Sequence, residues 1–224
     1  MRLDRIVSQR GGYSRKISSK MIRAGRVTVS GIIETNAKKH FPEEAPISID
    51  GHELRGRIAA YIYHKPAGML STTEDPMGRP CVGDVLPHRY HIVGRLDMET
   101  RGLLLLSADG GMSQRILHPK RAVEREYLAW VEGNPTMDLK DKLAQGVETS
   151  LGIAKAQVCS IDENCIRLVV TEGRNRIVRR MLHNSGHSVV DLQRIRFGPI
   201  ELNDLEEGWM VPISGAQEDA LYAI

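Results

Sequence analysis

The sequence predicts an α+β protein in which a small basic N-terminal domain precedes a mixed, largely antiparallel β-sheet domain with flanking helices. In the larger part of the chain, strand-like apolar runs outnumber helical patterns and lie too close together for regular β-α-β crossovers. Positive charge is concentrated at the N-terminal end. The longest pure apolar run is Leu103–Leu106, far short of the roughly 18 residues of a membrane span.

The N-terminal charge indicates a module that binds a polyanion. Residues 1–40 hold ten Lys and Arg against two acids, a net of +8, so the other residues must sum to −5 to give the +3 of the whole chain. A basic helix face is commonly a solvated surface, but this density of charge without acidic partners favours phosphate contact. The residues assigned to that contact are Arg2, Arg5, Arg15, Lys16, Lys20, Arg23 and Arg26.

Two helices and a hairpin are predicted within this module. A helical pattern of Leu3, Ile6 and Val7 ends at Gly11-Gly12. Ser14 is a suitable N-cap for a second helix, which has Ile17, Met21 and Ile22 as its inner stripe and ends at Gly25. Residues 27–29 and 31–33 form the hairpin.

The stretch RLDRIVSQRGGYSRKISSKMIRAGRVTVSG resembles the small RNA-binding domain first described in the S-four ribosomal protein, the αL fold. The resemblance covers residues 1–48 and is followed by a polar linker, HELRGRI, at 52–58. We therefore expect one domain, with its linker, over residues 1–57 and a second over residues 58–224.

The second domain begins with an apolar strand at 59–63, which ends at a Lys65-Pro66-x-Gly68 turn. Apolar and alternating runs predict the other strands, and amphipathic spacing predicts the helices. The strands are at 91–95, 103–107, 126–131, 153–159 and 165–171, and the helices at 111–117, 137–145 and 175–184.

Arg95 and Asp97 lie in a polar loop between two apolar strands, in GRLDMETRGLLLLSADG. A generic Arg-x-Asp pair is commonly a loop salt bridge worth less than about 1 kcal/mol. Here Gly94 and Gly102 bracket the pair and permit tight backbone geometry. A carboxylate at the end of a sheet must be paired or bear a desolvation penalty. An ionised, partly desolvated Asp97 with fixed cationic neighbours is chemically suited to be a nucleophile.

Two further stretches could supply neighbours for that carboxylate. The predicted helix of TEGRNRIVRRMLHNSGH places arginines opposite its apolar face, which suits an anion, although a solvated face is the alternative. Alternation in VEREYLAWV puts Tyr127, Ala129 and Val131 on one strand face. Tyr127 is then either core filler or an aromatic platform for a planar base.

These three stretches, in this order, resemble the RsuA/RluB-type ribosomal RNA pseudouridine synthases. The Gly-Arg-Leu-Asp signature with its Gly-Leu-Leu strand, the Tyr motif in EREYLAWV and the basic helix EGRNRIVRRM all match, and the resemblance covers essentially the whole chain. It implies an isomerase that detaches uracil from ribose, turns it and rejoins it through carbon five. No cofactor is implied.

The resemblance also implies a role for each site residue. Asp97 would be the catalytic carboxylate, and Arg95 would help open the RNA and stabilise the flipped-out nucleotide. Tyr127 would stack on the uracil and assist the final proton removal, and the Arg179 guanidinium would pair with Asp97 to keep it ionised. Further RNA contacts are expected from Arg174, Arg176 and Arg180.

Metal, disulfide and nucleotide-cofactor sites are not expected. The sequence has no P-loop and no Gly-x-Gly-x-x-Gly. Cys81, Cys159 and Cys165 form no Cys-x-x-Cys pair, and the ligand-like pairs His88 with His91 and His183 with His187 lack a third ligand nearby. The charged start MRLDRIV does not resemble a signal peptide, so a cytoplasmic location is expected.

The expected partner is ribosomal RNA or an assembling ribosomal subunit, with no membrane association and a monomeric enzyme. EREY with EGRNRIVRRM favours large-subunit RNA; a small-subunit RNA substrate is the alternative. A non-catalytic RNA-binding ribosome-assembly factor is the alternative of another class. Such a factor would have no need of a carboxylate that faces phosphates.

Overall fold

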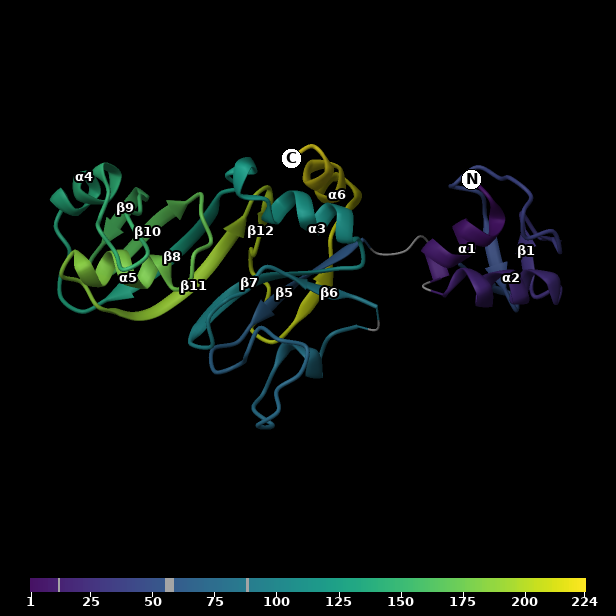
Figure 1. Cartoon of the computed structure of the whole chain (residues 1–224), viewed down its shortest axis with the longest axis horizontal. Coiled ribbons are helices and arrows are strands. Elements are labelled where there is room, and N and C mark those ends of the chain that lie inside the picture. The colour runs from purple at the N-terminus through teal and green to yellow at the C-terminus, as the bar shows by residue number, and fades with distance from the viewer. Residues whose placement is uncertain (12, 55–58, 88) are drawn as a thin grey trace. The chain divides into compact units, whose positions relative to one another are not determined.

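The computed structural model describes residues 1–11, 13–54, 59–87 and 89–224. The chain forms two compact units, Met1–Ile58 and Ala59–Ile224 (Figure 1). Four of the expected features fall outside the described residues in whole or in part: Gly12 at the end of the first helix, linker residues 55–58, the boundary after residue 57, and His88. No helix in the described ranges is long and apolar enough to cross a membrane.

Two helices and a four-stranded antiparallel sheet make up the first unit. As predicted, Ser14 caps the second helix, and its Oγ accepts a hydrogen bond from the N–H of Ile17 at 3.2 Å. The sheet has the order β2-β1-β3-β4, and the predicted hairpin is its β1–β2 pair. The elements are α1 (Leu3–Gly11), α2 (Arg15–Arg23), β1 (Val27–Val29), β2 (Ile32–Ile33), β3 (Ile47–Ile49) and β4 (His52–Glu53).

The inner stripe predicted for α2 is wrong at one position. Met21 and Ile22 are buried, but Ile17 is 48% exposed. Ser18 is fully buried in its place. The Ser18 hydroxyl donates to the carbonyl of Ser14 at 3.1 Å, so its polar group is satisfied within the helix and burial costs little.

The second unit is built on a nine-stranded sheet with the order β13-β5-β7-β11-β8-β10-β9, in which β6 also pairs with β7 and β12 with β11. Every pairing is antiparallel except that of β7 with β11, so the expected mixed, largely antiparallel sheet is confirmed. The strands are β5 (Ala60–Lys65), β6 (His91–Val93), β7 (Thr100–Ser107), β8 (Arg125–Val131), β9 (Gln157–Asp162), β10 (Cys165–Val170), β11 (Val189–Phe197), β12 (Ile200–Glu201) and β13 (Met210–Pro212).

Helices flank this sheet and bury it on both faces. Leu104 and Leu106 pack in one core with α4 and α5, whereas Leu103 and Leu105 pack in another with α3 and α6. The four leucines are fully buried because successive side chains of β7 point to opposite, covered faces. The helices are α3 (Gly110–Leu117), α4 (Asp138–Gln145), α5 (Ile177–Asn184) and α6 (Gly215–Tyr222), with 3₁₀ turns η1 (Val82–Asp84) and η2 (Pro119–Arg121).

Several predicted boundaries differ from the structure. The helix expected at 175–184 begins only at Ile177, because Arg176 has a left-handed backbone, with φ of 53°. The strand expected at 153–159 starts at Gln157, and Ala154 forms only an isolated bridge with Val147. Strands β11 to β13 and helix α6 were not predicted.

The parallel seam between β7 and β11 brings two distant segments of chain into close contact. Gly102 lies opposite Arg194, and its φ is 109°. A Cβ at Gly102 would lie 2.3 Å from the carbonyl oxygen of Arg194, so only glycine fits this position. The seam joins β7, the strand that follows the Asp97 loop, to β11, which in turn pairs with β8, the strand that carries Tyr127.

Candidate active site

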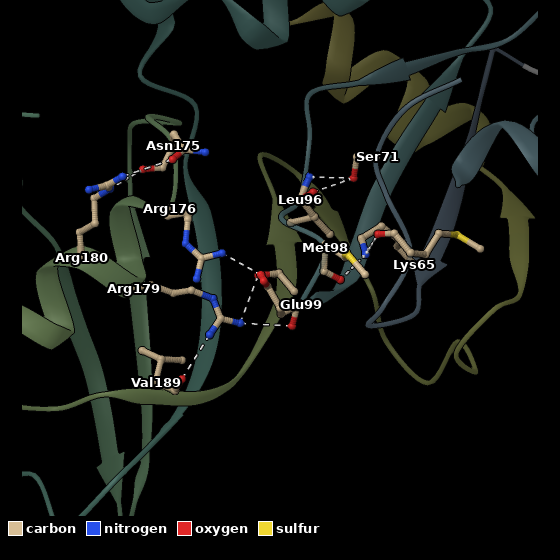
Figure 2. Close-up of polar contacts among 12 residues, drawn as sticks. Lys65, Ser71, Leu96, Met98, Glu99, Asn175, Arg176, Arg179, Arg180 and Val189 are labelled. Carbon is tan, nitrogen blue, oxygen red and sulfur yellow. Dashed lines mark hydrogen bonds and ion pairs between the residues drawn. The ribbon is translucent and has the colours of Figure 1, made fainter. Parts of the chain in front are cut away.

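The loop that carries Arg95, Asp97 and Glu99 joins β6 to β7, and hydrogen bonds hold its backbone from both sides. Ser71 Oγ accepts from the N–H of Leu96 at 3.1 Å and donates to the carbonyl of Leu96 at 2.8 Å (Figure 2). The N–H of Thr100 donates to the carbonyl of Asp97 at 3.0 Å. Gly94, with φ of 75°, allows the turn out of β6. The Asp97 backbone is therefore fixed before any substrate arrives.

Lys65 ties the Lys-Pro-x-Gly turn to the same loop. Its ammonium group is fully buried and donates to the carbonyls of Pro66 and Met69, each at 2.7 Å, and of Met98 at 3.4 Å (Figure 2). Burial lowers the pKa of Lys65 to about 8, although nearby acids including Asp97 oppose the shift. The turn that the sequence singled out thus supports the Asp97 loop.

A cavity of about 440 Å³ opens beside this loop. Asp97, Arg95 and Tyr127 all line it, so the structure brings together three of the four predicted catalytic residues. Arg174 and Arg176, from the loop before α5, line it as well. The cavity is large enough for one nucleotide, and its wall combines a carboxylate, guanidiniums and an aromatic ring.

Burial raises the pKa of Asp97 above its ordinary value. Arg176, Arg179 and Arg95 each oppose that rise, with Arg176 acting most strongly, whereas Glu99 adds to it. The cations therefore determine how far the carboxylate stays ionised inside a partly dry site. This environment matches the expectation of a desolvated carboxylate among fixed cations.

Arg179 lies near this site but on the other side of Glu99. Its guanidinium donates to the carbonyl of Val189 and the carbonyl of Glu99, each at 3.2 Å, and it lines a second hollow over α5 with Arg176 and Arg180 (Figure 2). In the described part of the chain, no ion pair joins Arg179 to Asp97. Backbone carbonyls hold the guanidinium instead, and it acts on the carboxylate through space.

Arg176 and Arg174 are both engaged with acids. Arg176 forms an ion pair with Glu99 at 2.7 Å, and Arg174 pairs with Glu172. Arg180 donates to the hydroxyl of Ser150 at 2.7 Å. These three residues, for which the sequence predicts RNA contacts, lie on α5 and the loop before it; Arg176 is exposed, and Arg174 and Arg180 are half-buried.

Tyr127 belongs both to the hydrophobic core and to the wall of the cavity. It is 8% exposed and packs in the core with β10 and α5, yet it also lines the cavity. The predicted alternation of β8 is confirmed, since Tyr127, Ala129 and Val131 are all buried on one side. The ring is thus rigidly held at the cavity wall.

Two buried arginines of the cavity wall were not predicted from the sequence. Arg125, two residues before Tyr127 on the same face of β8, and Arg194 on β11 both line the cavity and are 9% and 2% exposed. The i, i+2 relation of Arg125 to Tyr127 was a usable signal. Nothing in the sequence placed Arg194, because its position depends on the pairing of β11 with β8, where it lies opposite Tyr127.

In the first unit, the expectation of basic residues without acidic partners is wrong for four of them, one of which is Lys39, paired with Glu34 at 2.6 Å. Arg2 and Arg15 pair with the buried Asp4 at 2.7 Å and 3.4 Å, and Arg26 pairs with Asp50. Asp4 is buried in the first turn of α1, so it holds the guanidiniums of Arg2 and Arg15 at that end of the helix. Within the described ranges of this unit, the exposed lysines and arginines that form no ion pair are Arg5, Lys16, Lys20, Arg23 and Lys38.

Comparison with known proteins decides between the classes that this geometry allows. A family model described as RNA pseudouridylate synthase matches residues 59–184. The chain belongs to this family. An S4 domain model matches residues 1–45, which agrees with the resemblance seen in the N-terminal sequence.

Relatives of this pseudouridine synthase match it over most of its length. The ribosomal large subunit pseudouridine synthase B of Vibrio cholerae is 37% identical and covers 93% of this chain and 70% of its own. The protein of the same name from Bacillus subtilis is 34% identical, with 92% and 89% covered. A crystal structure of a pseudouridylate synthase has a TM-score of 0.68 and 27% identity, with 99% of each chain covered. The predicted family and reaction class, an RNA-directed isomerase, are confirmed.

Proposed function

We propose that this synthase converts a specific uridine of large-subunit ribosomal RNA to pseudouridine, with Asp97 as the catalytic carboxylate. The observation that carries the proposal is the cavity itself, in which Asp97 faces guanidiniums and the Tyr127 ring. The large-subunit substrate is supported by relatives of that name at 34% and 37% identity. Ribosomal RNA as partner, in the cytoplasm and with a monomeric enzyme, completes the proposal.

The reaction requires a uridine to leave its stack and enter the cavity. Arg95, which is exposed at the cavity mouth, stabilises the flipped nucleotide, and Tyr127 stacks on its base. The C1′–N1 bond breaks with its electron pair on the base, while the Asp97 carboxylate bonds to C1′. The base turns, C5 bonds to C1′ and the carboxylate leaves. Tyr127 assists removal of the C5 proton, and N1 gains a proton.

The first unit serves in this proposal as the docking module. Exposed cations on α1 and α2 contact phosphates, and in the larger unit the arginines of α5 and of the loop before it make further phosphate contacts. Arg176 and Arg179 hold Asp97 ionised, because each acts against the rise in its pKa. A small-subunit RNA substrate is the alternative to be tested.

The decisive experiment combines mapping with one substitution. Pseudouridines in ribosomal RNA are mapped in cells with and without the protein, and loss of one or more large-subunit positions is expected. Loss at a small-subunit position would redirect the substrate assignment.

Asp97→Asn tests the chemistry. The amide is nearly isosteric with the carboxylate but cannot act as a nucleophile, so tritium release from RNA labelled at C5 of uracil should fall at least about a hundredfold. RNA affinity should stay within a few-fold of wild type. Substantial residual turnover would exclude Asp97 as the catalytic carboxylate.

A further inference from the structure

Two buried arginines line the active-site cavity without any acidic partner. Arg125 and Arg194 are 9% and 2% exposed, and neither forms an ion pair within the described chain. Buried guanidiniums are ordinarily matched by a carboxylate, because an unpaired buried charge is costly. The roles proposed above for Arg95, Asp97, Tyr127 and Arg179 make no use of this pair.

Contacts with the ring of Phe197 and with backbone carbonyls hold both guanidiniums in place. Each lies over the ring of Phe197, Arg125 at 5.0 Å and Arg194 at 4.8 Å from its centroid. Arg125 donates from Nη1 to the carbonyl of Val123 at 2.8 Å, and Arg194 donates from Nε to the carbonyl of Leu103 at 2.8 Å. These contacts use one N–H of each group and fix the plane of both.

Donors remain that the described residues do not satisfy. Nη2 of Arg194 is buried and has no hydrogen-bond partner among them. Arg125 makes no described hydrogen bond besides the one to Val123, and its remaining nitrogens lie in a residue that lines the cavity. Two cations with free donors at the wall of one cavity constitute a preformed anion site.

Depth decides which part of the RNA this site receives. Arg95 and Arg176 are exposed at the cavity mouth, where a phosphodiester backbone can pass. Arg125 and Arg194 are buried beside Tyr127, the residue that in the proposed function stacks on the base. The negative charge that reaches this depth is therefore the charge that develops on the base.

We infer that Arg125 contacts and stabilises the uracil anion released during isomerisation, and that Arg194 acts as a positioning residue that adds positive charge behind it. This inference rests on the proposed function and specifies how the same site treats the base. When the C1′–N1 bond breaks, its electron pair stays on uracil and spreads over N1, O2 and O4. Guanidinium N–H groups suit those oxygens, and their charge lowers the energy of the separated base.

The first test compares two substrates in single-turnover reactions of the full chain. Arg125→Gln should slow isomerisation of uridine in RNA about a hundredfold, the usual effect of removing one preorganised donor. Fluorine at C5 stabilises the uracil anion by itself, so the same variant should slow consumption of 5-fluorouridine in RNA by a clearly smaller factor. RNA affinity should stay within about threefold. Arg167→Gln, on the exposed side of β10, is the matched control.

If Arg125→Gln slowed the reactions of uridine and 5-fluorouridine by equal factors, the inference would be overturned. A variant that lost only RNA affinity would also overturn it, because these arginines would then bind a phosphate. Arg194→Lys provides a second variant. Lysine keeps the charge but loses the planar fork, so it should preserve much of the rate if Arg194 contributes mainly charge. A fall with Arg194→Lys equal to that with Arg194→Gln would instead assign it a purely structural hydrogen bond.

A measurement on the wild-type protein covers the case in which variants do not fold. 5-Nitrouracil, which readily ionises near neutral pH, should bind more tightly than uracil in calorimetric titrations, and its affinity should fall as acid protonates it. Equal affinity for the two bases would contradict an anion site. A protein that binds 5-nitrouracil in this way but fails to isomerise RNA would refute the proposed function and leave the anion site standing.

Discussion

Burial and nearby arginines shift the pKa of Asp97 in opposite directions, and they come from different elements of the fold. Its own strand end buries it, whereas guanidiniums from the α5 region and from Arg95 favour its ionised form. The balance makes activity sensitive to pH in a predictable direction, since only the carboxylate is the reactive form.

Replacing Arg176 by Gln should shift the acid limb of the pH–rate profile to higher pH. Removing a cation raises the pKa of Asp97, so the ionised form appears only at higher pH. The loss of Arg176 also frees the charge of Glu99, with which it pairs at 2.7 Å, and this acts in the same direction. Single-turnover rates measured across pH test the shift.

Arg179→Ala should also shift the acid limb of the pH–rate profile to higher pH. The shift should be comparable to that of Arg176→Gln or smaller, since Arg176 affects the pKa of Asp97 more strongly than Arg179 does. Arg180→Gln is the control on the same helix, because Arg180 is not among the residues that shift the pKa of Asp97. A profile that moves equally in all three variants would point to a general effect of charge on RNA binding.

At the scale of elements, the β7–β11 seam is the part of the fold that the site depends on most. Gly102→Ala should destabilise the larger unit by roughly 3 kcal/mol or more, because a left-handed φ and a collision with Arg194 act together. Urea unfolding followed by tryptophan fluorescence measures this, since Trp130 and Trp209 both belong to the larger unit.

Gly110→Ala is the matched control for that substitution. Gly110 opens α3 with an ordinary φ, and a Cβ there meets nothing within 4 Å. Alanine should be neutral or slightly stabilising at this position. If Gly102→Ala behaved like Gly110→Ala, the seam would have to be more plastic than its close contacts indicate.

Elements with a clean apolar pattern were predictable, and those whose polar residues find partners only in the fold were not. Strand β7 is visible in the sequence as four leucines. Strand β11, VVDLQRIRF, contains three charged residues and so does not resemble a strand in the sequence. Two of these charges are paired across the sheet, Asp191 with Arg101 at 2.8 Å and Arg196 with Glu126 at 2.6 Å. Those partners are far away in the chain, so the local sequence does not reveal them.

The residues of the candidate site also fall into those that local sequence reveals and those that only the fold brings together. Asp97, Arg95 and Tyr127 stand in short motifs, so the resemblance could find them. Arg125 and Arg194 meet only because β8 pairs with β11, a register that involves residues far apart in the chain. The expected contact between Arg179 and Asp97 also depended on long-range geometry, and there Glu99 and Val189 offered the guanidinium other acceptors.

For the whole molecule, the division into two units predicts that RNA docking and chemistry can be separated. Residues 1–57 carry twelve Lys and Arg against six acids, a net of +6. The larger unit has its own cores and all four predicted catalytic residues, so it should fold without them. A slow reaction at high RNA concentration should survive.

Deleting residues 1–57 should weaken RNA binding and flatten its dependence on salt. Five exposed cations without ion pairs in the described part of this unit are removed, so the slope of log affinity against log salt should become shallower by about four. Filter binding across salt concentrations measures the slope, and tryptophan fluorescence checks that the remaining unit is folded. An unaltered slope would mean that the first unit does not dock RNA.

The parallel seam also fixes when the enzyme becomes competent during its own synthesis. Arg194 donates to the carbonyl of Leu103, a residue 91 positions earlier, and β13 pairs with β5 near the very start of the larger unit. The Asp97 loop therefore emerges from the translating ribosome well before β11, the strand whose Arg194 lines the same cavity. A nascent chain thus cannot form the complete cavity until β11 has emerged and paired with β7 and β8.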